Sequence, residues 1–509
     1  MKTKLTPFAK LMIVAVIVGG IVLAIYKTPL KKYIIPSGDA TTDVVDTDGE
    51  KVIKIGVVTW GGYVGGQYFN NGFKPNKESR FYKDYGFMVD FKVLDDFNAS
   101  RAAWKAGEVD LLWTTIDAFT TEVNGLQEFQ PQVVFQSDWS RGGDAVVVRR
   151  GIENVLDLKG KKVAFAEMTP SHTFLLWMLD AGQVRFDEIE AVKVASAIDA
   201  ADLFKKGQVD AAVVWSPDDA DCVAKVTGSK VLQSTKEASN IIADVFIVKK
   251  DFLDKNKETL AKLVEGWMKG AAEINTNADA KNKAAKILAE GLSQPEDFCI
   301  QAINNVRLCT YGDNQNFYNL KGSYKGVTGE EIWNRMEVKY TEVGYITSRI
   351  PNWRAIGNSS LISALTLTGA EHEAEPSIEF AEITGKEENL KAISTKRITI
   401  SFRPGEYSLD PNAKYIIDKE FLPLAKSFGN ARIRVEGNTD DKGAKAYNVE
   451  LSKKRAQAVV DYLSYEHKFD IKRFVVIGNG PDKPVSDNNT EDGRAKNRRT
   501  DFEILGEQQ

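Results

Sequence analysis

A short motif occurs twice in this chain, one hundred residues apart, and each copy precedes a strongly apolar run. The first copy, Lys105–Asp110, leads into Leu111–Thr115, and the second copy, Lys205–Asp210, leads into Ala211–Ser216. In each copy we expect a helix to end at the glycine, because glycine accepts the positive φ of a helix terminus without steric cost. A buried strand then follows. The repeat therefore predicts two similar lobes built from helices and strands.

Strand and helix patterns alternate through the part of the chain that contains this repeat. Val52–Val58 is typical of a buried strand, and it leads into Thr59–Tyr63, which contains two glycines. The alternation continues to about Trp353, which indicates βαβ units and a largely parallel sheet. Such sheets place ligands at the carboxyl ends of their strands. We therefore expect a ligand near the strand ends Trp113–Asp117 and Trp215–Asp218.

An apolar run near the N-terminus predicts a membrane anchor. Leu11–Tyr26 contains only apolar residues and glycine, with lysines on both sides. A full span needs ~20 residues, and flanking lysines can make up a small deficit. No small-residue cleavage site follows closely and no lipobox cysteine is present, so we expect an uncleaved anchor, with removal of the segment as the alternative. We assign residues 1–30 to a single transmembrane helix and residues 31–50 to a tether.

Length, net charge and cysteine content limit the number of folded units, the partners and the disulfides that we expect. The 509 residues suggest about three folded units. The net charge of -4 gives no reason to expect nucleic acid as a partner. Cys299 and Cys309 could pair in an oxidising compartment, but on one helix their offset would span ~15 Å, so buried free thiols are the simpler expectation.

Catalytic and metal-binding patterns are missing from the sequence. It has no glycine-rich phosphate loop, no His-Glu-x-x-His helix and no Gly-x-Ser-x-Gly elbow. Only His172, His372 and His467 are available for imidazole chemistry. We therefore expect neither an enzyme nor a bound cofactor or metal.

A second, smaller unit is predicted after an acidic connector. We assign residues 354–394, which include the acidic stretch Glu371–Glu382, to a linker, and residues 395–509 to a mixed α+β sandwich. The predicted elements of the sandwich are strands at Arg397–Phe402, Ile433–Glu436, Phe474–Ile477 and Thr500–Leu505, and helices at Tyr415–Phe428 and Leu451–Tyr465.

Polar residues of this unit have a spacing that suits one binding pocket. Asp440 closes a predicted strand, Arg455 follows on the first turns of the next helix, and Asn448 lies between them. A zwitterionic amino-acid end needs one fixed anion and one planar donor group, and such charge-assisted hydrogen bonds are strong. Arg498 would supply a second donor. The alternative is a surface salt bridge between Asp440 and Arg455, worth ~0–1 kcal/mol.

Residues 395–509 resemble the OmpA-like peptidoglycan-binding domain over nearly its whole length. In that family the pocket takes the diaminopimelate of the peptidoglycan stem peptide. The resemblance implies that Asp440 binds its ammonium group and Arg455 its carboxylate. Asn438 stands where the family commonly has histidine, which affects only the rim of the pocket. The resemblance depends on Gly437–Asp440, Tyr447–Asn448, Leu451–Ser452, Arg455–Ala456, Gly493–Arg494 and Asn497–Arg499.

Residues 51–353 resemble a type II periplasmic solute-binding protein, in the group that carries nitrate, sulfonate, taurine and thiamine-precursor binders. In such folds two lobes close over a small polar molecule, and backbone amides and strand-end hydroxyl groups bind its polar atoms. The resemblance depends on Val57–Tyr63, Lys105–Thr115, Ser137–Ser140, Gly142–Asp144, Leu156–Val163 and Gly207–Trp215.

The candidates for the cleft between these lobes are aromatic, hydroxyl and carboxyl side chains near the predicted strand ends. The acidic candidates Asp117, Asp144 and Asp244, together with Asp138, suit an amine or a cation better than a phosphate. Arg141 or backbone amides could reverse this preference. His172 is also a candidate, but a structural role is more common for such a residue. The ligand-binding candidates are Trp60, Tyr63, Thr114, Thr115, Asp117, Asp144, Ser171, Trp215 and Asp244.

These observations predict a single-pass protein of the bacterial inner membrane with most of its chain in the periplasm. We expect it to bind a small polar solute and peptidoglycan, and to pass the solute to an ABC transporter or another membrane complex. The alternative is a structural or motor-associated tether in which the binding fold is a spacer. Flagellar stator subunits share this plan, but Leu11–Tyr26 lacks the membrane carboxylate that ion conduction requires.

Overall fold

The computed structural model describes residues 49–400, 402–403 and 405–506. The predicted anchor, residues 1–30, and nearly all of the predicted tether lie outside these ranges. Across the described ranges, no helix combines the length and the apolar character needed to cross a membrane. The anchor therefore stays a prediction.

The first lobe is built on a six-stranded sheet with the order β11-β4-β10-β3-β1-β2. β1 pairs in parallel with β2 and β3, whereas β10 runs antiparallel to β3 and β4, and β11 runs antiparallel to β4. The strands are β1 (Val52–Val57), β2 (Met88–Val93), β3 (Leu111–Thr115), β4 (Pro131–Ser140), β10 (Ala243–Lys249) and β11 (Val306–Leu308).

The second lobe is built on a five-stranded sheet with the order β7-β6-β8-β5-β9. β6 is parallel to β7 and β8, and β5 is antiparallel to β8 and β9. Both sheets are thus mixed, and the prediction of a largely parallel sheet was wrong, because β5 and β10 enter their sheets from the other lobe. The strands are β5 (Asp144–Val148), β6 (Lys162–Ala166), β7 (Glu190–Val194), β8 (Ala211–Trp215) and β9 (Lys230–Ser234).

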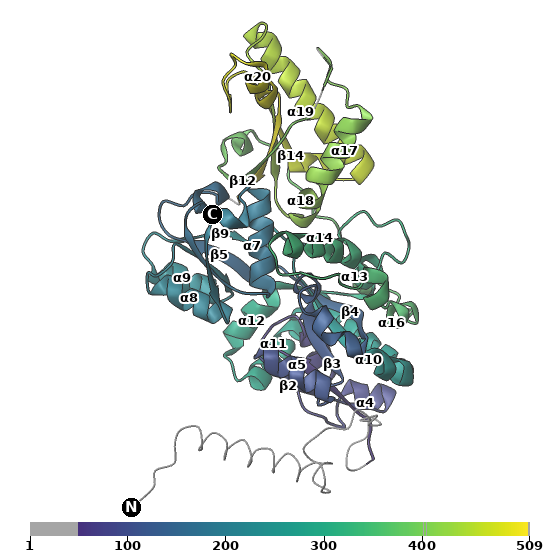
Figure 1. Cartoon of the computed structure of the whole chain (residues 1–509). Coiled ribbons are helices and arrows are strands. Elements are labelled where there is room, and N and C mark those ends of the chain that lie inside the picture. The colour runs from purple at the N-terminus through teal and green to yellow at the C-terminus, as the bar shows by residue number, and fades with distance from the viewer. Residues whose placement is uncertain (1–48, 401, 404, 507–509) are drawn as a thin grey trace, which may run out of the picture.

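Helices surround both sheets and fill the space between the lobes (Figure 1). The two-lobed α/β fold is confirmed. The helices of this part are α3 (Val64–Phe69), α4 (Arg80–Tyr85), α5 (Phe97–Ala106), α6 (Ile116–Phe119), α7 (Pro170–Ala181), α8 (Ala197–Lys205), α9 (Asp218–Lys225), α10 (Lys250–Thr276), α11 (Ala278–Leu292), α12 (Glu296–Asn304), α13 (Tyr311–Phe317), α14 (Gly329–Glu342), α15 (Trp353–Ile356) and α16 (Ser360–Ser363).

The repeated motif occupies equivalent places in the two lobes. α5 ends at Gly107 with φ 76°, and the chain turns at Gly207 with φ 78° just after α8. The aspartate of each copy then accepts a hydrogen bond from a backbone N–H on a neighbouring strand. Asp110 accepts from Lys54 at 2.8 Å, and Asp210 accepts from Lys162 at 2.9 Å. The same residues thus start β3 and β8, whose far ends face the space between the lobes.

A large aromatic cluster fixes α10 on the first sheet. The Trp267 ring lies 5.7 Å from Phe91, 5.2 Å from Phe135 and 4.9 Å from Phe246, centre to centre. A Cβ atom at Gly66 of α3 would lie 2.3 Å from the Trp267 ring, so only glycine fits there. Burial of such rings dominates the energy of a core.

Two segments carry the chain between the lobes, Ser140–Asp144 and Ser234–Ala243. The Thr235 hydroxyl oxygen accepts hydrogen bonds from the backbone N–H groups of Gly142 at 2.8 Å and Asp144 at 3.2 Å. It also lies 2.8 Å from the Ser140 hydroxyl oxygen. These contacts hold the two crossing segments together. Any hinge motion between the lobes would take place in these segments.

The segment predicted as a linker has two parts. Ile356, Leu361, Ile362 and Leu365 are buried in the same apolar core as the lobes. Residues 366–391 are mostly exposed. Packing of the lobes thus continues past the predicted boundary at 353.

The cysteines are free thiols, and all three are buried. Cys299 lies on α12, whereas Cys309 follows β11, so the two are not on one helix. No disulfide joins them.

The C-terminal domain is an α+β sandwich, as predicted. Its sheet has the order β12-β15-β13-β14, with β13 and β14 parallel and the other pairs antiparallel. The elements are β12 (Ala392–Ile398), α17 (Pro411–Glu420), α18 (Leu422–Ser427), β13 (Ile433–Asn438), α19 (Lys445–His467), β14 (Phe474–Gly480), α20 (Glu491–Asn497) and β15 (Thr500–Leu505).

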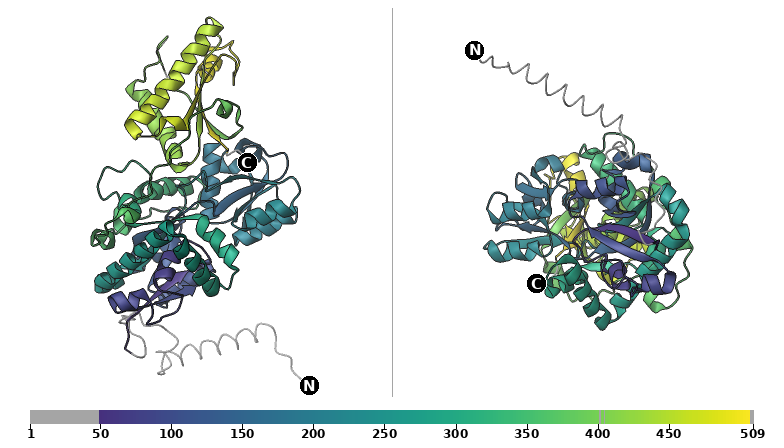
Figure 2. Two further views of the ribbon diagram at one scale, coloured as in Figure 1. Left: turned by 180° about the vertical axis from the view of Figure 1, so that it is seen from behind. Right: turned by 90° about the horizontal axis from the view of Figure 1, so that it is seen from below.

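The C-terminal domain packs on the second lobe, at the opposite end of the molecule from the first lobe (Figures 1 and 2). The Gln183 amide exchanges two hydrogen bonds of 3.0 Å with the backbone of Arg397. Asp180 of α7 forms an ion pair with Lys396 of β12 at 3.6 Å. Leu424 and Phe428 join the buried apolar core of the lobes. The domain is therefore docked by packing as well as by polar contacts.

Candidate functional site

A small cavity lies between the two lobes, where the carboxyl ends of β1 and β3 face β5, β8 and the start of α7. Its volume is about 20 Å³. One water molecule needs roughly 10–15 Å³ measured in this way, so the lobes are closed on each other with almost no free space. The cavity is lined by Val58, Thr59, Trp60, Tyr63, Trp113, Thr115, Asp144, Pro170, Trp215, Ile242 and Asp244.

Strand register explains why these side chains converge. Asp244 at the start of β10 pairs with Thr115 at the end of β3 and with Asp138 on β4. In the other lobe, Asp144 at the start of β5 pairs with Trp215 at the end of β8. Each lobe thus brings one carboxylate to the cavity wall, from strands that are far apart in sequence.

Six of the nine predicted ligand-binding residues line this cavity. Asp117, Ser171 and Thr114 do not. The six are Trp60, Tyr63, Thr115, Asp144, Trp215 and Asp244.

Thr114 points away from the cavity. Its hydroxyl donates a hydrogen bond to Glu122 at 2.9 Å and accepts one from Arg101 at 3.3 Å. Successive side chains of a strand point to opposite faces, so Thr114 and Thr115 could not both face the cleft. Thr114 therefore does not line this cavity, and its role as a ligand contact stays a prediction.

Asp117 and Ser171 are completely buried beside the cavity. Asp117 lies close to Thr173 in the first turn of α7, but neither carboxylate oxygen makes a hydrogen bond of good geometry. The Ser171 hydroxyl, also in that turn, has no partner. Both residues therefore lie behind the cavity wall.

His172 has a structural role. Its ring packs against Phe165, Tyr340 and Tyr345, and its Nδ1 accepts a hydrogen bond from the Met168 N–H at 3.3 Å. Burial lowers the pKa of His172 to about 3, so the ring is neutral at physiological pH.

Four buried carboxyl groups form one cluster here, and two of them, Asp144 and Asp244, line the cavity. The Tyr63 hydroxyl donates to Asp244, and Ser140 donates to one oxygen of Asp144 at 2.8 Å. Burial raises the pKa of Asp117, Asp138 and Asp144 to about 7. Burial, and then the charge of Asp138, raise the pKa of Asp244 well above its usual range. The cluster therefore holds more protons than separate aspartates would.

Two glycines allow the chain to pass close to Asp138 and to the Trp60 ring. The Trp60 Nε1 donates to Asp138 at 3.2 Å. A Cβ atom at Gly62 would lie 1.8 Å from an Asp138 oxygen, and one at Gly143 would lie 2.0 Å from the Trp60 ring. The two glycines therefore let Trp60 lie between the hinge and the carboxylates.

A second, larger cavity lies in the C-terminal domain at the end of β13. Its volume is about 250 Å³, and it is bounded by α19, α20 and the residues Thr399, Ile400 and Phe402. The lining residues are Thr399, Ile400, Phe402, Gly437, Asn438, Arg455, Ala495, Arg498, Arg499 and Thr500.

Arg455 enters this cavity from the third turn of α19, because the helix begins at Lys445, earlier than predicted. Its Nε donates to the Glu406 carbonyl oxygen at 3.0 Å, and its guanidinium carbon lies 4.8 Å from the Phe402 ring centre. In the described part of the chain Arg455 forms no ion pair, although the Asp440 charge is near enough to act on its pKa. The expected alternative, a salt bridge between Asp440 and Arg455, is therefore not formed.

Asp440 does not itself line the cavity, but it is paired with Arg498, which does. The two side chains lie 2.7 Å apart, and the second Asp440 oxygen accepts a hydrogen bond from the Lys442 N–H at 3.0 Å. Asn448 donates to the Lys442 carbonyl oxygen at 2.8 Å and does not line the cavity. Asn448 thus contacts the loop that carries Asp440, and its role as a direct contact to peptidoglycan stays a prediction.

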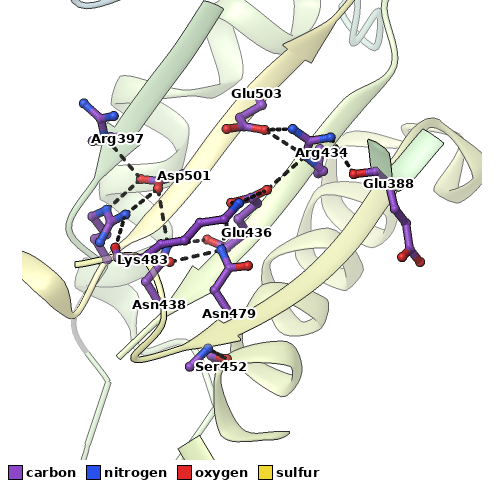
Figure 3. A network of polar contacts seen from close by, with 12 residues as sticks. Glu388, Arg397, Arg434, Glu436, Asn438, Ser452, Asn479, Lys483, Asp501 and Glu503 are labelled. Atoms are coloured by element: carbon purple, nitrogen blue, oxygen red, sulfur yellow. Dashed lines mark hydrogen bonds and ion pairs between the residues drawn. The ribbon is translucent and has the colours of Figure 1, made fainter. Parts of the chain in front are cut away.

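The cavity floor is fixed by a polar network on the sheet (Figure 3). Asn438 donates to Asp501 at 3.3 Å and accepts from Asn479 at 3.1 Å. Arg499 forms two hydrogen bonds with Asp501, of 3.0 and 2.9 Å. Asn438 is only 3% exposed, so it belongs to the floor rather than to the rim. This network could not be predicted from the sequence, because its members come from three separate strands and a loop.

The fold and the two cavities define a two-lobed solute-binding fold joined to a small α+β domain. Residues 75–280 match the NMT1/THI5-like family, and residues 401–498 match the OmpA family. The chain therefore combines an NMT1/THI5-like solute-binding domain with a C-terminal OmpA domain.

Each half has curated relatives. The C-terminal part is 34% identical over 117 residues to the peptidoglycan-associated lipoprotein of Pseudomonas putida, covering 23% of this chain and 66% of that protein. The solute-binding part is 25% identical over 210 residues to the taurine-binding periplasmic protein of Escherichia coli K12, covering 40% of this chain and 62% of that protein. The chain spans between 25% and 66% of the length of the curated relatives it matches.

Among solved structures, the periplasmic aliphatic sulphonate binding protein of Escherichia coli is similar, with a TM-score of 0.48 and 17% identity. The match covers 60% of this chain and 97% of that one.

Proposed function

We propose that this chain is a cell-envelope protein that captures a small polar solute between its two lobes and attaches to peptidoglycan through its C-terminal domain. The relatives of the two halves are named for solute binding and for association with peptidoglycan. We therefore propose binding without catalysis. Anchoring in the inner membrane by residues 1–30, with the folded part in the periplasm, belongs to this proposal.

The observation that carries wall attachment is the 250 Å³ cavity with Arg455 and Arg498 on its wall and Asp440 paired with Arg498. Diaminopimelate ends in a zwitterion, which needs a fixed carboxylate for the ammonium group and a guanidinium for the carboxylate. Asp440 already accepts from Arg498 and from a backbone N–H, so its position is set before a ligand arrives. Among the residues that the structure describes, Arg455 has no acidic partner and donates to the carbonyl oxygens of Glu406 and Arg403, and we propose that its guanidinium binds the ligand carboxylate.

Pelleting with purified sacculi tests this attachment. Arg455→Ala removes the cavity guanidinium, and we expect at least a roughly tenfold weaker affinity, the loss typical of one charged hydrogen-bond partner. Lys454→Ala is the matched control, because Lys454 is the next residue on α19 and pairs with Glu450 outside the cavity. Equal pelleting of the two variants and the unchanged protein would count against the proposal.

Solute capture requires the lobes to open. The closed cavity of about 20 Å³ has no room for an organic molecule. The two crossing segments, Ser140–Asp144 and Ser234–Ala243, allow hinge motion of the kind that admits ligands in two-lobed proteins. Native mass spectrometry of the purified protein should show a bound small molecule that is lost on unfolding. A protein that is always empty, and that binds no solute added in excess, would contradict capture.

The small cavity also favours a second candidate, a tether between membrane and wall in which the lobes act as a spacer. Copurification from membranes separates the two functions. Components of an ABC transporter or a similar membrane complex support solute delivery, whereas a motor-like channel supports the tether.

A further inference from the structure

The charge of the interlobe cavity indicates what kind of solute it accepts. Among its eleven lining residues none is lysine, arginine or histidine, while Asp144 and Asp244 each present a carboxyl group. Asp144 is only 2% exposed, and its Oδ1 has no hydrogen-bond partner. A buried acceptor without a donor is costly, and a donor on the ligand would satisfy it.

Two arginines near the cavity form ion pairs elsewhere, although Nε and Nη1 of Arg141 are buried without a hydrogen-bond partner and its charge acts on Asp138. Arg141 forms an ion pair with Glu375 at 2.6 Å, and Arg101 forms one with Glu122 at 2.7 Å on the far face of β3. Neither arginine lines the cavity. Burial raises the pKa of Asp144 and Asp244, and because neither has a basic partner in the cavity wall, a cationic ligand would be what favours their charged forms.

The helix that points toward the cavity offers few backbone donors for an anion, although the Ser171 hydroxyl in its first turn has no hydrogen-bond partner, nor do the Thr115 hydroxyl and the indole N–H groups of Trp113 and Trp215 in the cavity wall. A helix N-terminus usually favours anions through its free N–H groups. Here the residue of α7 that lines the cavity is Pro170, which has no N–H, and Asp117 lies beside the first turn through its neighbour Thr173. The positive end of α7 thus already faces a carboxyl group of the protein.

Aromatic rings form much of the remaining wall. Trp60, Tyr63, Trp113 and Trp215 all line the cavity. The faces of such rings attract organic cations, and several rings around one site are typical for ammonium groups. Across the described ranges, no group of three or more His, Cys, Asp and Glu residues could hold a metal ion.

We propose that the interlobe site takes an organic ammonium ion, whose charge is balanced by Asp144 and Asp244 and whose carbon groups pack on Trp60, Tyr63 and Trp215. This inference rests on the proposed solute capture and narrows it to one chemical class. On closure the ammonium group replaces the missing hydrogen-bond donor of Asp144. A sulfonate or phosphate group in the same place would face two carboxylates without a basic partner.

Thermal unfolding of the purified protein tests the proposal with defined probes. The cationic probes are choline, methylammonium, guanidinium and putrescine, and the anionic probes are ethanesulfonate and sulfate, all at equal ionic strength. We expect at least one cation to raise the unfolding midpoint in a saturable way and neither anion to do so. No rise with any of the four cations, or a saturable rise with an anion, would overturn the proposal.

Asparagine variants identify the residues involved. Asp144→Asn and Asp244→Asn keep the side-chain shape, and each should weaken binding of the active cation about tenfold or more. Asp254→Asn is the matched control, since Asp254 is exposed and pairs with Lys250 at 2.7 Å far from the cavity. Unchanged affinity in both cavity variants would also overturn the proposal.

The outcomes separate this inference from solute capture itself. Saturable binding of an anion, or a neutral molecule found by native mass spectrometry, would be consistent with solute capture but would contradict binding of an organic cation. A protein that binds no molecule would contradict both solute capture and cation binding.

Discussion

Asp144→Asn should stabilise the ligand-free protein in a pH-dependent way. The pKa of Asp144 rises from 3.8 to about 7 on folding, first through burial and then through the charges of Asp117 and Asp138. Between these values the folded state keeps a proton that the unfolded state has lost. The carboxyl group therefore lowers the free energy of unfolding as pH rises from about 4 to about 7, and not further above that.

The size of this effect follows from the pKa difference. One pKa unit is worth about 1.4 kcal/mol, so roughly three units set an upper limit of about 4 kcal/mol. Opening of the lobes hydrates Asp144 and reduces the cost, so we expect about half of the limit, roughly 2 kcal/mol at pH 8. This corresponds to a rise of roughly 3–6 °C in the unfolding midpoint.

Differential scanning calorimetry at pH 4.5 and pH 8 measures the difference between variant and unchanged protein. Asp144→Asn should be more stable at pH 8 and close to the unchanged protein at pH 4.5, whereas the exposed control Asp254→Asn should show no such difference. Nearby groups that also titrate are Asp117, Asp138, Asp244 and Tyr63, and they are the same in all samples. Equal stability changes at both pH values would refute the reasoning.

Two further substitutions test the packing around the sites. Gly143→Ala places a Cβ atom 2.0 Å from the Trp60 ring, so we expect a loss of about 1–3 kcal/mol in calorimetry and weaker solute binding, and an unchanged midpoint would contradict the close approach. Gln183→Ala removes two hydrogen bonds of 3.0 Å to the Arg397 backbone, worth about 1 kcal/mol each. Limited proteolysis should then cut residues 366–391 faster, and an unchanged rate would argue against docking through this contact.

The sequence predicted the architecture well where a local pattern decides it. Gly107 and Gly207 adopt positive φ just after α5 and α8, and the apolar segments that follow them form the buried strands β3 and β8. Both features could be predicted because they depend only on neighbouring residues. Strand direction was predicted less well. β5 and β10 run antiparallel to β8 and β3, since the chain crosses between lobes at these points, and only the three-dimensional path reveals this.

The sites show a similar limit. Thr114 and Thr115 are adjacent in sequence, but successive side chains of a strand point to opposite faces, so Thr115 lines the cavity whereas Thr114 contacts Glu122. Asn448 was expected beside the ligand because it lies between Asp440 and Arg455, yet α19 begins at Lys445 and turns its side chain toward the loop. Spacing identifies which residues gather near a site, whereas the face of the element decides which of them line it.

Competition for wall binding tests the central claim most directly. Protein bound to sacculi is washed with free diaminopimelate or with an equal concentration of cadaverine, which has two ammonium groups but no carboxylate. We expect diaminopimelate to release the protein at a lower concentration than cadaverine, and Arg455→Ala to bind the sacculi roughly tenfold or more weakly, as in the pelleting test. Release by both compounds at the same concentration, or full binding of Arg455→Ala, would contradict recognition of diaminopimelate by this cavity.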